Sequence, residues 1–517
     1  MLISDIVRRN AAYFGDAEAL HVPGGRSSTW TEMDERTNRC ARALLDLGLV
    51  KGDRLSAFMP NCGEYLDFYF SCAKSGIIGA ALNIRLTAKE LGSYLATVEP
   101  SAILVHADLA AQASELIARV PSIRHVIGVG PDHGFDLDLE ALLAAQEPTD
   151  PGCDVDEHDL YQLGATSGTT GIPKAAMLSH RNAIAAISNW MAETWIPEMG
   201  TCLQTIPYFF NPGGPSGMQP VLMKGGRSII PPAFEAGSFM RLVEEHRVTH
   251  SILVPTMIGM VLNHPDRDKY DLSSLKVLMC GGSSLSREQL IGVQQLFGRR
   301  SFYPQFGMAE TYSCGTLLRP EDQITDGTPE QVKRLASVGK PHVLMQMRVV
   351  DAEGKDVPHD DETPGELWVK GDTVSSGYFR MPEETAGSRE GEWFKSGDIG
   401  VVDPEGFITI VDRAKDIIIT GGINVYSRDI EDALYEHPAV LQAAAIGIPH
   451  EVWGEAIHAV VTLKAGTSAT EEELMAFAAE RLAGFKKPRS IEIVEALPIS
   501  GTGKILKREL RAQHQPR

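Results

Sequence analysis

Paired cysteines are what this sequence most clearly lacks. Its seven cysteines, Cys40, Cys62, Cys72, Cys153, Cys202, Cys280 and Cys314, are scattered along the chain and form no C-x-x-C pair. Neither a disulfide framework nor a zinc site is therefore expected. The histidines show no paired ligand spacing, and we assign them no metal-binding role.

The sequence also lacks long apolar runs and an excess of basic charge. No run approaches the length of a membrane span, and charged residues such as Asp5 and Arg8 stand where a signal peptide would need its apolar core. The 48 basic and 68 acidic side chains give a formal charge of −20. We therefore expect a cytosolic protein without a nucleic-acid or integral membrane partner, in which local cations must meet any anionic ligand.

A Walker A loop is absent too, but a related composition is present in the nine residues from Thr166 to Lys174. Glycines there let backbone N–H groups approach an oxyanion, hydroxyls donate hydrogen bonds, and Lys174 supplies a positive charge. Two residues separate Gly171 from Lys174, and Ala175 follows, so the Walker spacing is not met. Considered alone, the stretch is as typical of a flexible surface loop as of a phosphate site.

The length, 517 residues, predicts at least two domains. Strand and helix patterns alternate through most of the chain, which predicts doubly wound parallel sheets with helices on both faces. From about Ala336 short strands separated by turns predict a mostly antiparallel β subdomain. The last hundred or so residues form a small α+β pattern. The expected fold is α/β, with an N-terminal domain over 1–412, a mobile C-terminal domain over 413–517, and a hinge near 412–416.

Particular elements follow from the same patterns. Thr31 with Asp34 resembles the start of a helix that ends near Gly48. Further expected helices span Glu64–Ser75, Ser238–Glu245, Met257–Asn263, Arg287–Phe297, Arg428–Glu436 and Glu471–Leu482. Expected strands span Leu55–Met59, Ile77–Leu82, Arg227–Ile230, Ser251–Val254, Leu275–Met279, Met345–Val350, Gly365–Val369, Phe407–Val411, Val440–Ile448, Ile457–Leu463 and Ile491–Val494.

Four further motifs are weak when each is considered alone. Phe306–Thr311 surrounds a glycine with an aromatic ring and a carboxylate, but is also typical of a turn. Trp393–Asp398 is compatible with an ordinary hairpin, Asp412–Asp416 with a solvated charged face, and Pro498–Lys504 with a glycine-rich turn. Their order and separation are what make them informative together.

In that order, and with Thr166–Lys174, the motifs resemble those of the AMP-forming acyl-CoA synthetase superfamily, which also includes luciferases and peptide-synthetase adenylation domains. The resemblance covers nearly the whole chain, from the region Leu44–Asp53 to Lys504. It implies that a carboxylate attacks the α-phosphorus of ATP, that pyrophosphate leaves, and that the acyl group then passes to a thiol. The expected co-substrates are ATP and CoA, with Mg²⁺ as the cation and a small carboxylic acid as substrate. A homodimer is left open.

The resemblance also implies roles for single residues. Lys174, Glu310 and Lys504 would be catalytic, with Glu310 as the Mg²⁺ ligand and Lys504 at the α-phosphate and carboxylate oxygens. ATP would be bound by Thr166, Ser167, Gly168, Thr169, Thr170, Gly171, Lys174, Phe306, Gly307, Asp398 and Arg413, with Phe306 on adenine and Asp398 on ribose. Lys415 would be the hinge. CoA would meet Gly421, Gly422, Trp453 and Lys487, in a second orientation of the C-terminal domain.

The acyl pocket would be lined by Tyr208, Phe209, Asn211, Gly281, Gly282 and Ser283. Tyr208, Phe209, Phe210 and Met218 suggest a largely apolar pocket, which favours a fatty, alicyclic or aromatic acid over acetate. These aromatic residues are equally compatible with packing behind the pocket. Two departures from the family pattern stand out. Ala309 replaces a Thr or Ser whose hydroxyl would touch the α-phosphate, and Thr311 cannot be assumed to replace it. The stretch Pro207–Gly214 has Asn211 and one residue more than a Pro-x-x-His pattern.

Three other functions are weighed against the ligase. A stand-alone adenylation enzyme would load a carrier protein, although the aspartate that amino-acid-loading versions place in the region Phe209–Gly214 is missing. A luciferase-type oxygenase would emit light. A non-catalytic nucleotide-binding protein would have no need of Lys174, Glu310, Asp398, Arg413 and Lys504. His180, close to the phosphate loop, is expected to cap or pack a helix, because the mechanism has no proton for it to move.

Overall fold

The computed structural model describes residues 1–517 except 167–172, 211–214, 282–284, 286, 500–504 and 515–517; of 215 and 216 it describes the backbone alone. The chain divides into two compact units. The first comprises Met1–Met347 and Val369–Phe394, and the second comprises Arg348–Trp368 and Lys395–Arg517. Each unit is described by itself.

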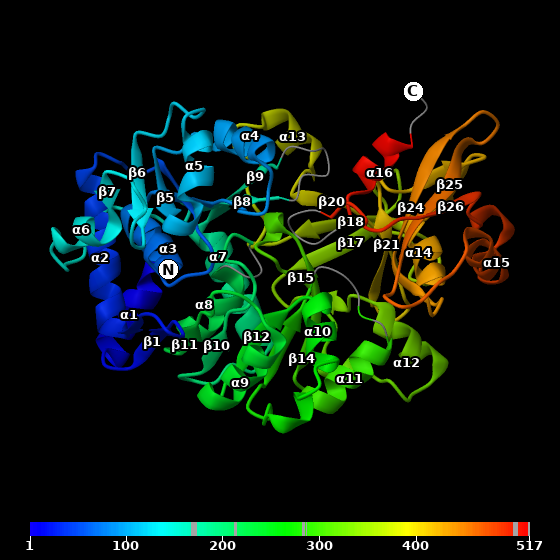
Figure 1. The fold of residues 1–517 in the computed structure, drawn as a ribbon, viewed down its shortest axis with the longest axis horizontal. Helices are drawn as coiled ribbons and strands as arrows, with labels where there is room; N and C mark the ends of the chain where they lie inside the picture. The colour runs from blue at the N-terminus through cyan, green and yellow to red at the C-terminus, as the bar shows by residue number, and fades with distance from the viewer. Residues whose placement is uncertain (167–172, 211–214, 282–284, 286, 500–504, 515–517) are drawn as a thin grey trace. The chain divides into compact units, whose positions relative to one another are not determined.

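A seven-stranded sheet lies in the blue and cyan part of the first unit (Figure 1). Its strands follow the order β7 (Leu137–Asp138), β6 (His125–Val129), β5 (Ala102–His106), β3 (Arg54–Phe58), β4 (Ile78–Ala81), β8 (Leu160–Ala165) and β9 (Ala175–Ser179). All neighbours are parallel except the hairpin of β8 and β9. The accompanying helices are α1 (Ser4–Phe14), α2 (Trp30–Asp46), α3 (Glu64–Ser75), α4 (Ala88–Val98), α5 (Ala110–Ile117), α6 (Leu139–Ala144) and α7 (His180–Glu193).

Both faces of this sheet are buried, as doubly wound topology requires. In β5, Ala102 and Leu104 join one apolar core, whereas Ile103 and Val105 join another. The alternation follows from the two-residue period of a strand, since successive side chains point to opposite faces. The continuous apolar runs in the sequence therefore correspond to strands covered by helices on both sides.

The second sheet of this unit has nine strands. Their order is β16 (Lys340–Pro341), β15 (Gly315–Leu317), β14 (Phe302–Gly307), β13 (Val277–Cys280), β12 (His250–Leu253), β10 (Thr201–Leu203), β11 (Arg227–Ile229), β1 (Glu18–His21) and β2 (Ser27–Thr29). Six strands from β14 to β1 are parallel. Its helices are α8 (Pro215–Met223), α9 (Ala236–His246), α10 (Pro255–Leu262) and α11 (Arg287–Phe297). One core receives side chains from both sheets, including Leu104 and Ile252.

The remaining strands form two smaller sheets. One has the order β17 (Gln346–Val350), β18 (Gly365–Lys370), β20 (Trp393–Val402) and β19 (Arg389–Glu390), with β21 (Ile408–Arg413) beside β20. The other has the order β23 (Ile423–Val425), β22 (Ile418–Thr420), β25 (Gly454–Leu463) and β24 (Val440–His450), with β26 (Ser490–Ile493) beside β25. Further helices are α12 (Pro329–Lys333), α13 (Pro382–Gly387), α14 (Ser427–Tyr435), α15 (Glu471–Arg481) and α16 (Lys507–Gln513).

The predicted α/β class with a smaller C-terminal α+β part is confirmed. The predicted start of the second helix is wrong: α2 is capped by Thr29 with Glu32, not by Thr31 with Asp34. Asp34 instead pairs with the buried Lys74, 2.6 Å away. Residues 395–412 pack with the C-terminal residues. Packing does not test where a chain bends, so the hinge at 412–416 stays a prediction.

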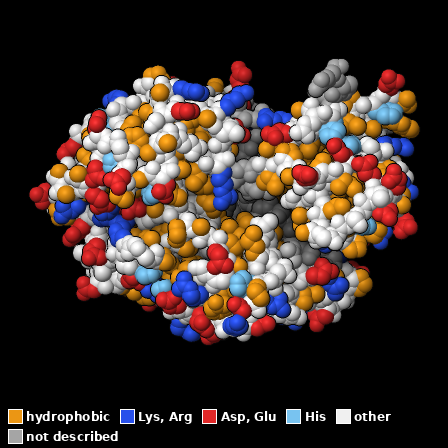
Figure 2. Space-filling view, viewed as in Figure 1, with side chains coloured by type: hydrophobic (Ala, Val, Ile, Leu, Met, Phe, Trp, Pro, Cys, Tyr) orange, Lys and Arg blue, Asp and Glu red, His pale blue; other side chains and the backbone are white. Residues whose placement is uncertain are grey.

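Two surface properties complete the description. None of the helices in the described part of the chain combines the length and apolar composition needed to cross a bilayer. On the face shown in Figure 2, acidic side chains are scattered among basic ones and do not gather over one element.

Candidate functional site

The described ends of the Thr166–Lys174 stretch close the β8–β9 hairpin. The Thr166 N–H donates to the Lys174 carbonyl over 2.9 Å, and the Lys174 N–H donates to Thr166 Oγ1 over 3.2 Å. Ser167, Gly168, Thr169, Thr170 and Gly171 lie outside the described residues. Their phosphate-binding role stays a prediction. What the structure describes is the base of the loop and the lysine that leaves it.

Lys174 and Glu310 both contact Tyr378, one at the ring and the other at the hydroxyl. The sequence motifs did not predict this tyrosine. The Lys174 Nζ lies 4.6 Å from the centre of the Tyr378 ring, within cation–π range. The Tyr378 hydroxyl donates to Glu310 Oε1 over 2.7 Å. Two of the predicted catalytic residues, 136 positions apart in the sequence, are therefore brought into one cluster. A cation and a carboxylate are the groups that phosphate and Mg²⁺ would each require.

The backbone around Tyr378 explains why the tyrosine sits there. Residues 376–379 run alongside β9: the Met177 N–H donates to the Gly377 carbonyl, and the Phe379 N–H to the Ala175 carbonyl, each over 2.8 Å. Gly377 has a φ of +131°, and a Cβ there would lie 2.3 Å from Thr385 Cγ2. Only glycine fits. A glycine before an aromatic residue was the one local signal for Tyr378, and it is too common to identify a site.

Glu310 stands on the short 3₁₀ turn Ala309–Thr311 that follows β14. The Ser375 N–H donates to the Glu310 carbonyl over 2.7 Å and fixes the turn. Two consecutive residues, Tyr312 and Ser313, have positive φ values of +53° and +64°. Strain of this kind persists only where surrounding contacts impose it, and it is concentrated at functional sites.

The structure describes three predicted or doubtful residues near this turn. Phe306 is half-buried on β14, and a Cβ on Gly307 would lie 2.2 Å from the Ser313 carbonyl oxygen. The buried Thr311 hydroxyl bonds to the Met308 and Cys314 carbonyls. Thr311 is therefore turned into the protein and does not replace the hydroxyl missing at Ala309. Adenine stacking by Phe306 stays a prediction.

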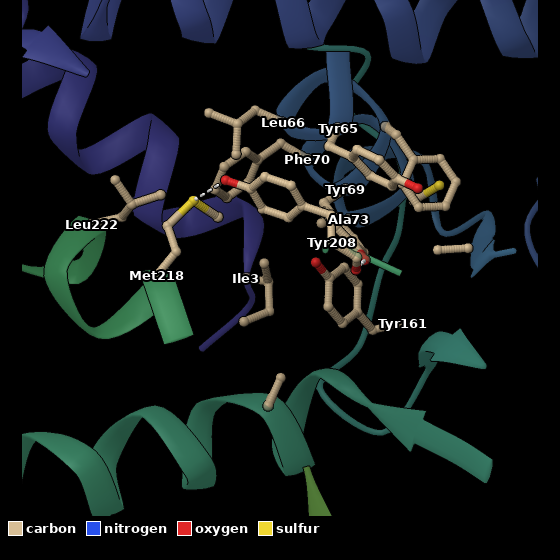
Figure 3. Packing of buried hydrophobic residues seen from close by; sticks show 14 of the residues in the cluster. Ile3, Tyr65, Leu66, Tyr69, Phe70, Ala73, Tyr161, Tyr208, Met218 and Leu222 are labelled. Carbon is tan, nitrogen blue, oxygen red and sulfur yellow. Dashed lines mark hydrogen bonds between the residues drawn. The ribbon is translucent and has the colours of Figure 1, made fainter. Parts of the chain in front are cut away.

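Tyr208, predicted to line the acyl pocket, is fully buried in the core (Figure 3). Its ring stacks on Tyr65 with 5.1 Å between centroids, and its hydroxyl lies 3.2 Å from Met218 Sδ. The Tyr69 hydroxyl donates to the Tyr208 carbonyl over 2.7 Å. These contacts match the packing alternative that the sequence left open for this residue. A fully buried side chain can meet a substrate only if the site rearranges.

The other predicted pocket residues are only partly described. Phe209 is nearly buried and packs edge-to-face on Phe210, with 4.6 Å between ring centroids. A Cβ on Gly281 would lie 3.4 Å from Gln305 Cγ, which is an ordinary contact. The described residues thus leave room for a Cβ at this position. Asn211, Gly282 and Ser283 lie outside the described residues.

In the second unit, Asp398 and Arg413 face each other across strands β20 and β21. The Arg413 Nε lies 2.5 Å from Asp398 Oδ1, and the carboxylate is almost fully buried. The Asp398 N–H donates to Ser396 Oγ over 3.0 Å. The two predicted nucleotide-binding residues are therefore paired by strand register, as a shared ribose site would require. Their contact with ribose stays a prediction.

The predicted hinge lies between two anchored aspartates. The Asp412 carboxylate accepts from the Ser427 N–H over 2.6 Å and from its hydroxyl over 2.7 Å. Asp416 pairs with Arg511 over 2.8 Å. Lys415 is exposed on the turn between them. The segment is thus tied to helices α14 and α16 on both sides of Lys415.

Lys504 itself lies outside the described residues. The chain on either side of it is held together: Ile499 and Ile505 form an antiparallel bridge, and the Leu506 N–H donates to the Pro498 carbonyl over 2.8 Å. Both predicted catalytic lysines therefore belong to segments whose ends are joined by backbone hydrogen bonds. The role of Lys504 stays a prediction.

Gly421, one of the predicted CoA-binding residues, contacts another of them, the exposed Trp453. The Gly421 N–H donates to the Trp453 carbonyl over 2.8 Å, and a Cβ on Gly421 would lie 2.9 Å from Trp453 Cε3. Gly421 and Gly422 both have positive φ. Arg489 lies over the Trp453 ring at 5.7 Å, and Lys487 is half-buried nearby in sequence. Their contact with CoA stays a prediction.

Comparison with known proteins gives a consistent result. The model of the AMP-binding enzymes matches residues 7–379, and that of the AMP-binding enzyme C-terminal domain matches residues 429–504. A feruloyl-CoA synthase of Amycolatopsis is 35% identical over 94% of both chains. A long-chain-fatty-acid–CoA ligase of Mycobacterium tuberculosis is 30% identical over 94% of this chain and 93% of its own. The crystal structure of ATP-bound MatB from Rhodopseudomonas palustris superposes with a TM-score of 0.87 at 27% identity, covering 99% of each chain.

Proposed function

Because the chain belongs to the family of AMP-binding enzymes and is an AMP-forming acid–thiol ligase of the acyl-CoA synthetase type, we propose that it converts a hydrophobic carboxylic acid to its CoA thioester. A carboxylate oxygen attacks the α-phosphorus of ATP and pyrophosphate leaves, which gives the acyl-adenylate. The CoA thiol then attacks the acyl carbon, loses its proton to solvent, and AMP leaves.

The cluster of Lys174, Tyr378 and Glu310 is the observation that carries this proposal. Carboxylates are ionised at neutral pH, so adenylation needs no general base, and the catalytic demand is for positioned charge. Lys174 supplies positive charge beside the loop predicted to hold the phosphates. Tyr378 fixes the orientation of the Glu310 carboxylate through one of its oxygens. The donor set suits a nucleoside triphosphate rather than a neutral ligand.

Glu310 fits the Mg²⁺ that the family implies. Its carboxylate is a hard oxygen ligand, half-buried, and one of its oxygens accepts from a neutral hydroxyl. When bound, Mg²⁺ would neutralise charge on the phosphate oxygens. Glu310 would hold the ion. Lys504 would supply positive charge at the α-phosphate and carboxylate oxygens, where the new bond forms.

The hydrophobic class of acid rests on two supports. The relatives named above act on ferulate and on long-chain fatty acids, by their names. The half-buried Phe210, packed edge-to-face on Phe209, offers an aromatic surface in the stretch where the acyl pocket is predicted, whereas the fully buried Tyr208 offers none. Neither acetate nor an amino acid would need such surroundings. We therefore favour aromatic, hydroxycinnamic and longer aliphatic acids.

A panel of acids tests the proposal. The protein is incubated with ATP, Mg²⁺, CoA and, one at a time, acetate, hexanoate, palmitate, benzoate, 4-coumarate and ferulate, and the thioester is identified by mass spectrometry. We expect acyl-CoA with at least one aromatic or longer aliphatic acid and little with acetate. Pyrophosphate release without acyl-CoA for every acid would favour the carrier-loading alternative. Acetate as the best substrate would overturn the hydrophobic class.

A further inference from the structure

Two histidines and a glutamate that are distant in the sequence meet at the end of the C-terminal sheet. His458 lies on β25, Glu492 on the neighbouring β26, and His514 directly follows α16. His514 Nε2 lies 2.7 Å from Glu492 Oε2, and His458 Nε2 lies 3.8 Å from the same oxygen. One ligand atom from each of the three residues falls within 4.8 Å of the others. The proposed function uses none of them.

The second nitrogen of each imidazole is engaged in a way that directs Nε2 into the cluster. His514 Nδ1 lies 2.7 Å from the Leu510 carbonyl oxygen, which can only accept, so Nδ1 carries the proton. His458 Nδ1 lies 2.7 Å from Ser490 Oγ. Metal-binding histidines characteristically bind through one nitrogen while the other donates to a carbonyl or a polar side chain. His514 meets that condition, and His458 meets it when its Nδ1 donates to the Ser490 hydroxyl.

His458 provides a second, independent observation that points to a ligand in the cluster. Its side chain is 7% exposed, and its Nε2 is buried without a hydrogen-bond partner among the described residues. A buried polar atom left unpaired lowers the stability of the fold. The nitrogen is turned toward Glu492 Oε2 but is too far away to bond to it. An ion between the three residues would satisfy this atom.

We propose that His458 Nε2, Glu492 Oε2 and His514 Nε2 bind a divalent transition-metal ion of the zinc type, with water as the fourth ligand. Two imidazoles and a carboxylate favour Zn²⁺, Co²⁺ or Ni²⁺ over Mg²⁺ or Ca²⁺, which prefer oxygen ligands. Bonds of about 2.0–2.1 Å in a tetrahedron separate ligand atoms by about 3.3 Å. The two distances to Glu492, 2.7 and 3.8 Å, lie on either side of that value.

Metal binding would displace the proton that His514 shares with Glu492. It would also connect the end of α16 to two strands of the sheet. The helix starts three residues after Lys504 and is also held by the buried Leu510 and by ion pairs of Lys507 with Glu431 and of Arg511 with Asp416. The ion would therefore stabilise the segment that follows the predicted catalytic lysine. We infer a structural role for the ion, outside the adenylation chemistry.

Zinc titration of the full chain tests the site. The protein is stripped with a chelator and titrated calorimetrically with ZnCl₂, and Co²⁺ is substituted to record the visible absorption of a tetrahedral centre. We expect one strongly bound zinc ion per chain, a higher apparent Tm with zinc, and a tetrahedral cobalt spectrum. In His514→Gln and Glu492→Gln, zinc affinity should fall by about tenfold or more. In His437→Gln, which changes a histidine of the same unit outside the cluster, it should not change.

Glu492 is partly exposed, so its substitution tests the site even if the buried His458→Gln does not fold. Two results would overturn the proposal. Absence of stoichiometric zinc binding would reduce the cluster to a proton-sharing pair of His514 and Glu492. Binding of equal strength in the wild type and in both cluster variants would locate the zinc elsewhere in the chain.

Discussion

Tyr378 joins two predicted site residues although no sequence motif pointed to the tyrosine itself. Its ring lies under the Lys174 ammonium and its hydroxyl holds the Glu310 carboxylate. The lysine and the glutamate were predicted from motifs, whereas the tyrosine lies in the stretch 375–379, which has no charged residue. The pairing of this stretch with β9 and the hydrogen bond from Ser375 to Glu310 bring the three together. The tyrosine is a positioning residue in our account.

Tyr378→Phe should weaken the use of Mg²⁺ in adenylation. The variant keeps the ring beneath Lys174 but removes the hydrogen bond that orients Glu310. Loss of such an orienting partner typically costs about 10–100-fold in metal affinity or activity. Pyrophosphate exchange measured against Mg²⁺ concentration should show a raised half-saturation value, while the apparent Tm changes little.

Tyr94→Phe is the matched control for that variant. Tyr94 is also buried, and its hydroxyl donates to the Leu163 carbonyl over 3.2 Å, without contact with Lys174 or Glu310. Its Mg²⁺ dependence should equal that of the wild type. An unchanged Mg²⁺ dependence in Tyr378→Phe would contradict the orienting role.

A second residue, His180, should make stability depend on pH. Burial lowers the pKa of His180 to about 4, and its Nδ1 accepts the Ile3 N–H over 3.2 Å. Between about pH 6.5 and pH 4 the unfolded chain binds a proton that the folded chain does not, so stability falls as pH falls. This shift is worth about 3 kcal/mol.

The measurement compares the apparent Tm at about pH 7.5 and about pH 5 in the wild type and in His180→Asn. An asparagine oxygen can accept the Ile3 N–H but does not titrate, so the variant should lose less Tm on acidification. Burial also lowers the pKa of His250 to about 4 and that of His342 to about 3, and both remain in the variant. Equal losses in the two proteins would count against His180.

At the scale of elements, sequence patterns predicted most helices and strands because local rules decided them. Helix α3 and helix α11 have the expected bounds, since periodic apolar positions and clear ends mark both. The start of α2 was misplaced because two capping pairs two residues apart are nearly equivalent in sequence. Tertiary contacts decide between them: Asp34 binds Lys74, which leaves Thr29 and Glu32 to complete the capping box.

The stretch that carries Tyr378 depends on Gly377, so Gly377→Ala should both destabilise the first unit and slow adenylation. A Cβ would meet Thr385, which cannot move freely because its hydroxyl bonds to the Tyr378 N–H and the Met381 carbonyl. A residue forced into such a backbone region costs about 1–3 kcal/mol. The apparent Tm should fall, and pyrophosphate exchange should fall with it.

Gly387→Ala provides the comparison. Gly387 ends α13, and a Cβ there would meet nothing within 4 Å. Alanine favours a helix by about 1 kcal/mol over glycine, so this variant should be as stable as the wild type or more so. If Gly377→Ala kept the same apparent Tm and pyrophosphate exchange as Gly387→Ala, a Cβ at Gly377 would be tolerated and the account would be wrong.

At the scale of the whole molecule, the sequence could predict the order of the domains and the candidate site residues that each unit contributes. It could not predict which distant residues meet. The pairing of Asp398 with Arg413 follows from strand register, and the cluster of His458, Glu492 and His514 follows from the packing of a helix end on a sheet. Neither arrangement has a sequence spacing that would reveal it. Several predicted site residues, Lys504 among them, still depend on the resemblance alone.

The division of work between the two units makes a further prediction. Lys504→Ala should abolish most adenylate formation, because it removes the charge that stabilises bond formation at the α-phosphorus. It should leave the transfer to CoA from a chemically supplied acyl-adenylate near the wild-type rate. Lys464→Ala removes an exposed lysine of the same unit and should alter neither step. Equal loss of both steps in Lys504→Ala would instead indicate a general defect of the second unit.

The central claim is that the acid passes through an adenylate before it reaches CoA. The most direct test mixes the enzyme, in excess, with ATP, Mg²⁺ and the best acid of the panel without CoA, quenches the reaction, and quantifies nucleotides and adenylate by mass spectrometry. Our account predicts acyl-adenylate and pyrophosphate in equal amounts, and their conversion to acyl-CoA and AMP once CoA is added. Formation of acyl-CoA with ADP and phosphate, or without any adenylate before CoA is added, would contradict it.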